Sequence, residues 1–163
     1  MVQLIEQGVR ETSSYLDKPA LDTRVLQALT EVPRHEFVPI DIRDQAYENR
    51  PLPIGYGQTI SQPYIVAIMT DLIGPKKDHR ALEIGTGSGY LAAILSRLVE
   101  QVFSMEIVEP LGKQARERLK DLGHHNVEVA IADGYHDWKA HAPFDIIIVT
   151  AAASHIPPPL IKQ

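Results

Sequence analysis

In the second half of the chain, short apolar runs alternate with segments whose apolar residues recur every three or four positions. A short apolar run is typical of a buried strand, and the longer period is typical of an amphipathic helix. The runs predict strands at 80–84, 102–106, 127–131 and 145–150. Because strands that alternate with helices form parallel sheets covered by helices, we predict an α/β fold for this part.

The first 60 residues show no strand alternation and are predicted to form one or two helices, followed by a proline-punctuated segment. A further helix is predicted to begin at 61–63, where Ser61 suits an N-cap and Pro63 suits the first turn. Gly74 and Pro75 are expected to end this helix. Its apolar residues are expected to form a buried face: Ile65, Ile68, Met69, Leu72 and Ile73.

Length and charge limit the classes of protein to consider. At 163 residues the chain is expected to be one domain, 1–163, in which 1–79 is a helical N-terminal extension with an active-site loop and 80–163 is a βαβ core. A net charge of −5 with only 16 basic residues leaves no basic stripe, so nucleic acid is not an expected partner.

The absence of cysteine excludes disulfides and thiolate metal sites, and it suits a reducing compartment. The histidines show no metal-ligand spacing, and the pair His124-His125 is expected to be solvated in a loop. No uncharged apolar run reaches the roughly 20 residues that span a bilayer. We therefore expect a cytoplasmic protein with no metal and no membrane partner.

The candidate chemistry begins at the turn that follows strand 80–84. Glycines stand at alternate positions, Gly85, Gly87 and Gly89, where they permit positive φ and a close approach of the main chain to a ligand. A dinucleotide fingerprint would need its third glycine where Tyr90 stands. The next strand ends in an acidic residue, Glu106, at the sequence spacing from the glycines that is expected of a ribose-binding residue. A nucleoside-bearing cofactor is the favoured interpretation, and a tight turn beside a polar strand end is the alternative.

Two motifs carry a family resemblance. Residues 83–89, with the pattern E-x-G-x-G-x-G, resemble the first motif of class I S-adenosylmethionine-dependent methyltransferases. The segment 57–63, Gly-Gln-Thr-Ile-Ser-Gln-Pro, resembles more specifically the protein-L-isoaspartate (D-aspartate) O-methyltransferases. The match also includes 32–39, Asp133-Gly134 and 143–153.

The resemblance implies transfer of a methyl group from S-adenosyl-L-methionine to the free α-carboxylate of L-isoaspartyl and D-aspartyl residues in damaged proteins, which starts their repair. The cofactor product would be S-adenosyl-L-homocysteine. Ser61 matches the family's active-site serine, although an N-cap role is the alternative from its position. The residues that the resemblance assigns to the cofactor are Gln58, Thr59, Ile60, Glu83, Gly85, Gly87, Ser88, Gly89, Glu106, Ile107, Asp133 and Gly134.

The same resemblance implies a Rossmann-like sheet in which 127–131 lies at one edge, followed by 102–106, 80–84 and 145–150. Such a sheet normally has seven strands, and about four are visible here. If the chain ends at Gln163, strand 145–150 is an exposed apolar edge that can self-associate. A catalytically impaired cofactor-binding or interaction domain of the same fold is therefore a second hypothesis. A methyltransferase for another acceptor is a third.

Overall fold

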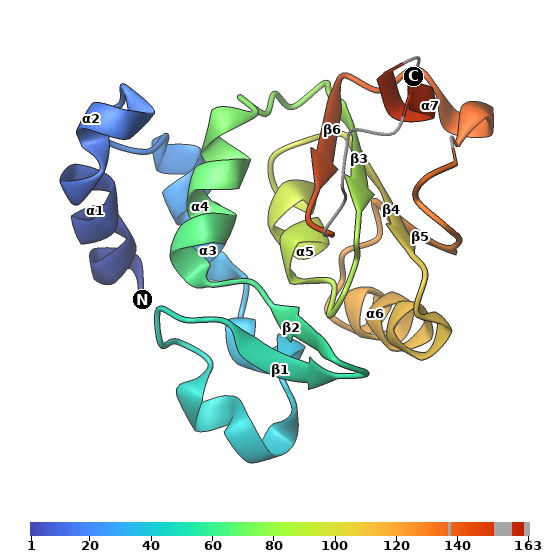
Figure 1. The fold of residues 1–163 in the computed structure, drawn as a ribbon, viewed down its shortest axis with the longest axis horizontal. Helices are drawn as coiled ribbons and strands as arrows, with labels where there is room; N and C mark the ends of the chain where they lie inside the picture. Colours follow the sequence, from blue (N-terminus) through green and yellow to red (C-terminus); the bar gives the residue numbers. More distant parts are fainter. Residues whose placement is uncertain (137, 152–157, 162–163) are drawn as a thin grey trace. The chain divides into compact units, whose positions relative to one another are not determined.

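The computed structural model describes residues 1–136, 138–151 and 158–161. The part of the family resemblance that falls on 152–153 lies outside the described residues. The chain divides into two compact units, Met1–Gly74 and Pro75–Gln163, which we call the N-terminal unit and the sheet unit. Figure 1 shows their elements.

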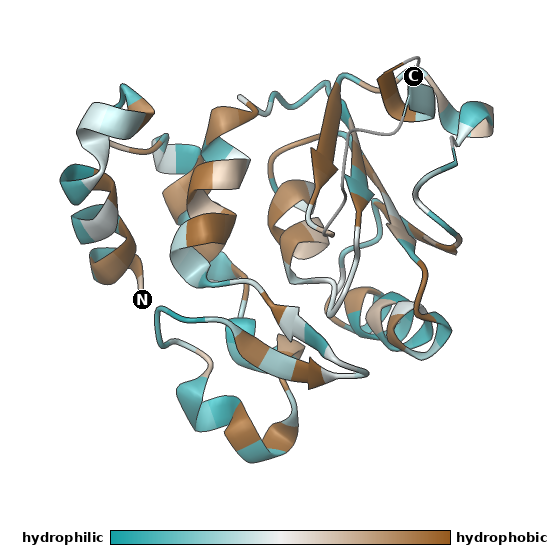
Figure 2. Ribbon diagram, viewed as in Figure 1, coloured by the Kyte–Doolittle hydropathy of each residue, from teal (hydrophilic) through white to brown (hydrophobic). Residues whose placement is uncertain are grey.

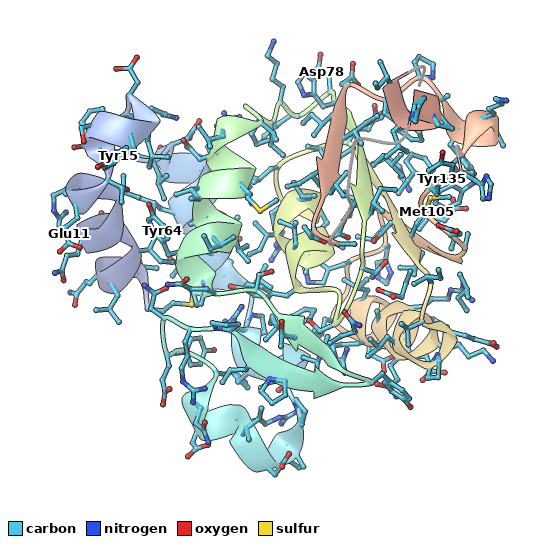
Figure 3. The ribbon with its side chains drawn as sticks, viewed as in Figure 1. Glu11, Tyr15, Tyr64, Asp78, Met105 and Tyr135 are labelled. Carbon is cyan, nitrogen blue, oxygen red and sulfur yellow. The ribbon has the colours of Figure 1, made fainter. Side chains whose placement is uncertain are left out.

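Helices make up most of the N-terminal unit, and three α-helices precede residue 60, where one or two were predicted. Its core comes from apolar residues three or four positions apart on the first helices, such as Ile5 and Val9, or Val25 and Leu29. Tyr64 projects from the last helix toward the first (Figure 3) and its hydroxyl lies 2.5 Å from Thr12 Oγ1. The helices are α1 (Val2–Glu11), α2 (Ser13–Leu16), α3 (Thr23–Glu31) and α4 (Pro63–Leu72), with 3-10 helices η1 (Arg34–Phe37) and η2 (Ile40–Gln45).

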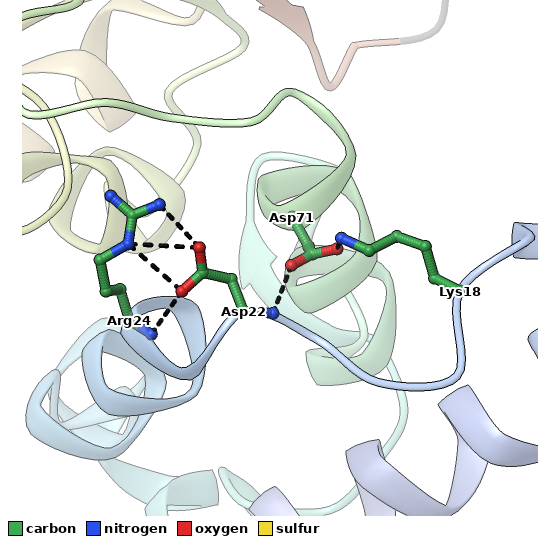
Figure 4. A network of polar contacts seen from close by, with 4 residues as sticks. All are labelled: Lys18, Asp22, Arg24 and Asp71. Atoms are coloured by element: carbon green, nitrogen blue, oxygen red, sulfur yellow. Dashed lines mark hydrogen bonds and ion pairs between the residues drawn. The ribbon is translucent and has the colours of Figure 1, made fainter.

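The expected buried face of α4 is wrong. Ile65 and Leu72 are 36% and 57% exposed, and the buried side carries the polar residue Asp71. The Asp71 carboxylate accepts hydrogen bonds from the Lys18 ammonium and from the main-chain N–H of Asp22, at 2.7 Å for the latter (Figure 4). A buried carboxylate is tolerated when donors surround it, and hydrophobic periodicity alone does not reveal such partners.

A β-hairpin precedes α4, although the sequence predicted no strand before residue 60. Strand β1 (Leu52–Gly55) pairs antiparallel with β2 (Gln58–Ile60). Pro53 is tolerated here because in a two-stranded hairpin its missing N–H can face away from the partner. The turn has positive φ at Gly55, Tyr56 and Gly57.

The sheet unit confirms the predicted α/β fold. Its four strands are parallel and lie in the order β5-β4-β3-β6, the order expected from the resemblance. At the start of β6, Asp145 Oδ2 accepts the Arg80 N–H at 2.8 Å, so Asp145 has the structural role expected for a strand terminus. The strands are β3 (Arg80–Ile84), β4 (Gln101–Glu106), β5 (Val127–Ile131) and β6 (Ile146–Val149).

Helices cover the sheet. The helices α5 (Tyr90–Ser96) and α6 (Glu109–Asp121) pack on β4 and β5. Leu160 of the short helix α7 (Pro158–Ile161) joins a core cluster with strand residues such as Leu82 and Phe103. In Figure 2 β6 is brown along its length, whereas α6 mixes teal and brown as an amphipathic helix does.

The expectation that His124 is solvated is wrong: the side chain is buried, and its Nδ1 lies 2.7 Å from Ser96 Oγ. Burial lowers the pKa of His124 below its ordinary value.

Within the parts of the chain that the structure describes, no helix combines the length and the apolar composition needed to cross a bilayer.

Candidate functional site

The glycine turn after β3 has the backbone conformation that the sequence predicted. Gly85, Gly87 and Gly89 have φ values of 99°, 54° and 89°, a region that side chains disfavour. A Cβ on Gly85 would lie 2.8 Å from Thr150 Oγ1 and 3.1 Å from the main-chain nitrogen of Ala151. Glycine at position 85 is therefore required both by conformation and by space.

The amide groups of the turn donate mainly within the protein. The N–H groups of Gly85 and Thr86 donate to the Met105 carbonyl at 2.8 and 3.1 Å. The Gly89 N–H donates to the Thr86 carbonyl at 2.8 Å. What these glycines offer a ligand is thus the absence of side chains at the edge of the sheet rather than a set of free donors.

Glu106 joins the end of β4 to this turn. Its Oε2 accepts the N–H of Gly87 at 2.7 Å and its Oε1 accepts the N–H of Val108 at 2.9 Å. Each carboxylate oxygen can accept a further hydrogen bond. The acidic strand end and the glycine turn are therefore adjacent, as their spacing in the sequence predicted, and Glu106 retains acceptor capacity for a ligand hydroxyl.

Glu83 lies one strand away and is completely buried. Its Oε2 accepts a hydrogen bond from Ser104 Oγ at 2.5 Å, and Thr86 Oγ1 lies 2.6 Å from the same Ser104 hydroxyl. In the described part of the chain, Oε1 has no hydrogen-bond partner. Burial, and to a smaller extent the charge of Glu106, raise the pKa of Glu83 to about 8. An acceptor oxygen buried without a donor is unfavourable, so Oε1 suits a donor supplied by a ligand.

The turn after β5 completes this edge of the sheet. Asp133 Oδ1 accepts the N–H of Tyr135 at 2.9 Å, so Asp133 shapes the turn. Gly134 packs so closely on the Ile84 side chain that a Cβ has no room there. Ile107, beside Glu106, is 67% exposed and offers an apolar surface.

The structure thus brings together, at the carboxyl edge of one sheet, every residue of the sheet unit that the resemblance assigned to the cofactor. Carboxyl ends of parallel strands are where α/β proteins bind ligands. The residues assigned to the cofactor at this edge are Glu83, Gly85, Gly87, Ser88, Gly89, Glu106, Ile107, Asp133 and Gly134. Among the described residues there is no cluster of three metal-binding side chains.

Ser61 lies in the N-terminal unit, between β2 and α4, and its predicted N-cap role is wrong. The N-cap residue of α4 is Gln62, which makes no side-chain capping bond. The Tyr64 N–H instead donates to Asn49 Oδ1 at 3.0 Å. Within the described chain no protein group hydrogen-bonds the Ser61 hydroxyl, which is therefore available for another partner.

The residues before Ser61 form β2. Gln58 and Thr59 are exposed and Ile60 is buried. Thr150 was not among the predicted site residues, and its hydroxyl donates to the carbonyls of Ile84 and Gly85 at 3.1 and 2.8 Å. Its place at the end of a predicted strand was the available signal.

Comparison with known proteins decides the family. A model of the family described as "Protein-L-isoaspartate(D-aspartate) O-methyltransferase" matches residues 13–163. The chain belongs to this family. A protein-L-isoaspartate O-methyltransferase 2 from Polaromonas sp. is 61% identical over the whole chain, which spans 77% of that relative. A protein of the same name from Syntrophobacter fumaroxidans is 62% identical, and the chain spans 66% of its length.

Solved structures of the isoaspartate methyltransferase family confirm the fold. A structure named protein-L-isoaspartate O-methyltransferase is 29% identical, with a TM-score of 0.83 over the whole chain, which covers 52% of that structure. A Plasmodium falciparum structure with a TM-score of 0.77 is 24% identical and shows the shared fold alone. That structure is described as a putative protein-L-isoaspartate O-methyltransferase in complex with S-adenosyl-L-homocysteine, and the chain covers 77% of it.

Proposed function

We propose that this protein transfers a methyl group from S-adenosyl-L-methionine to the free α-carboxylate of L-isoaspartyl and D-aspartyl residues in damaged proteins. The activity named for its relatives supports the acceptor. The observation that carries the cofactor assignment is the buried Oε1 of Glu83, which has no hydrogen-bond partner among the described residues, beside the glycine turn and Glu106. A methyl donor that bears an ammonium group and ribose hydroxyls can donate hydrogen bonds to the carboxylates of Glu83 and Glu106.

Each residue at the carboxyl edge has a role in this proposal. Glu83 accepts a hydrogen bond from the ammonium group of the donor, and that positive charge favours the ionised carboxylate. Glu106 accepts hydrogen bonds from the ribose hydroxyls. Asp133-Gly134 and the exposed side chain of Ile107 border the adenine. When bound, S-adenosylmethionine supplies an electrophilic methyl group on a positively charged sulfur.

The acceptor needs little activation by the protein. A carboxylate is already ionised at neutral pH, so no general base has to remove a proton. An oxygen of the carboxylate forms the bond to the methyl carbon as the bond from carbon to sulfur breaks, which gives a methyl ester and S-adenosylhomocysteine. Opposite charges are neutralised in this step, so exclusion of water favours it.

Orientation of the acceptor is then the main task of the protein. In our proposal the Ser61 hydroxyl donates a hydrogen bond to the acceptor carboxylate, and Gln58, Thr59 and Ile60 line the methyl-transfer site. The absence of a capping bond at Ser61 supports this role, because the hydroxyl has no competing structural partner in the described chain.

The test is methyl transfer from radiolabelled S-adenosylmethionine to an isoaspartyl peptide, with the aspartyl peptide of the same sequence as the control. Label incorporated as a base-labile ester in the isoaspartyl peptide alone supports the proposal. Equal transfer to both peptides contradicts the repair function. Cofactor binding in calorimetry without any transfer would instead favour the binding-domain hypothesis.

Two finer expectations stay predictions. Location in the cytoplasm is consistent with the composition and is checked by cell fractionation. Self-association through strand β6, an edge strand among the described strands, is checked by sedimentation of the purified protein.

A further inference from the structure

Arg34 is the largest fully buried side chain among the described residues, and it links two separate main-chain segments of the N-terminal unit. Its Nε donates to the Ala46 carbonyl at 2.8 Å and its Nη2 donates to the Ser61 carbonyl at 2.7 Å. Burial of a guanidinium is unfavourable unless its donors are paired. The two carbonyls pair two of the three nitrogens of the guanidinium, and the guanidinium in turn links the two segments.

Residues earlier in the chain hold the main chain around Ser61 in place. Arg34 binds the carbonyl of Ser61, and Asn49 accepts the N–H of Tyr64, three residues further on. Neither contact uses the Ser61 side chain. The preceding 3-10 and loop segments therefore anchor the backbone at Ser61. The Ser61 hydroxyl is not used in this anchoring and stays available for a substrate.

We infer that Arg34 is a positioning residue for methyl transfer, which fixes the main chain at Ser61 and thereby the direction of its hydroxyl. The inference rests on the proposed function, in which Ser61 orients the acceptor. The planar guanidinium fork binds two carbonyls in a fixed geometry, whereas a lysine ammonium is a single point charge. Arg34→Lys thus keeps the charge but loses the link.

The test is a double-mutant cycle with the wild type, R34K, S61A and the double variant, using methyl transfer to an isoaspartyl peptide. R34K is expected to lower kcat by roughly 10- to 100-fold, the effect of a small misplacement of a reacting group. Its affinity for S-adenosylhomocysteine should equal that of the wild type. In the S61A background, R34K should reduce kcat by less than about twofold more, because both variants remove the same interaction. Losses that multiply would overturn the inference, as would an S61A kcat equal to that of the wild type.

Lys18→Ala is the matched control. It removes a charged partner of the buried Asp71 in the same unit and leaves the Ser61 carbonyl untouched. It should lower the urea midpoint of unfolding yet keep the wild-type kcat. If K18A and R34K lower kcat equally at equal loss of stability, Arg34 has only a structural role. Arg34→Met, which keeps an unbranched side chain without the charge, replaces R34K if that variant does not fold.

Hydrogen exchange separates this inference from the proposed function. If the wild type does not methylate isoaspartyl peptides, the proposed function fails, and amide exchange still tests the anchoring by Arg34. Amides of 58–62 should exchange at least roughly tenfold faster in R34K, whereas those of α1 and α3 should keep their wild-type rates. Unchanged exchange at 58–62 would overturn the anchoring role.

Discussion

Replacement of the buried Glu83 by Gln should stabilise the protein at neutral pH. Burial raises the pKa of the Glu83 carboxyl from its ordinary 4.5 to about 8, so the carboxyl is protonated in the folded chain at pH 7. In the unfolded chain it is ionised. Folding therefore takes up a proton, and the stability that is present below pH 4.5 is lost progressively as the pH rises toward 8.

The size of the effect follows from the pKa difference. Between 4.5 and 7 the uptake acts over roughly 2.5 pH units, each worth about 1.4 kcal/mol, so the free energy of unfolding loses about 3 kcal/mol by pH 7. Gln has no ionisable group and matches the shape of a protonated carboxyl. E83Q should therefore equal the wild type at about pH 4.5 and exceed it by about 3 kcal/mol at pH 7.

Urea unfolding followed by tryptophan fluorescence measures this difference. The chain has one tryptophan, Trp138, whose ring lies 5.6 Å from that of Phe103 in an edge-on contact, so its fluorescence reports on the sheet unit. Glu117→Gln, on the exposed side of α6, removes a carboxylate without altering the core and should give a curve near that of the wild type. If the free energies of unfolding of E83Q and the wild type change in parallel from about pH 5 to 8, the protonated state of Glu83 is refuted.

Three other substitutions test the site and the sheet. Ser61→Ala should lower kcat at least roughly 10-fold, through loss of a hydrogen bond to a charged acceptor, with cofactor affinity unchanged in calorimetry; an unaltered kcat would remove the role of Ser61. Glu106→Gln should weaken S-adenosylhomocysteine binding by roughly 10-fold, and an equal dissociation constant would contradict the ribose contact. Burial lowers the pKa of His124, so the wild type should lose stability as the pH falls below the ordinary value of 6.5. His124→Gln should flatten that loss in thermal unfolding, and an identical slope would refute it.

The sheet was predictable because helices cover its strands and impose continuous apolar runs. Strands 80–84 and 127–131 have the predicted bounds, and the strand order is confirmed. The hairpin before Ser61 was not predicted, since Pro53 and the surrounding glycines hide its alternation. The glycines at 55 and 57 were a local turn signal for this hairpin that the sequence predictions did not use.

The cofactor edge was likewise predictable, because carboxyl ends of neighbouring parallel strands meet at one edge of a sheet. The spacing of Glu106 from the glycines, at the end of the next strand, therefore predicted its place beside the turn. The contact of Arg34 with Ser61 joins residues 27 positions apart, and no local pattern encodes it. The burial of Asp71 similarly depends on Lys18, which approaches from a distant loop.

A titration of the isotope-labelled protein with S-adenosyl-L-homocysteine, followed by nuclear magnetic resonance, tests the cofactor site most directly. We expect the amide signals of Gly85, Gly87 and Gly89, together with those of 106–108 and 133–134, to shift in a saturable manner. Binding that leaves these signals in place and shifts others, or no binding at millimolar ligand, would contradict the assignment of the carboxyl edge as the methyl-donor site.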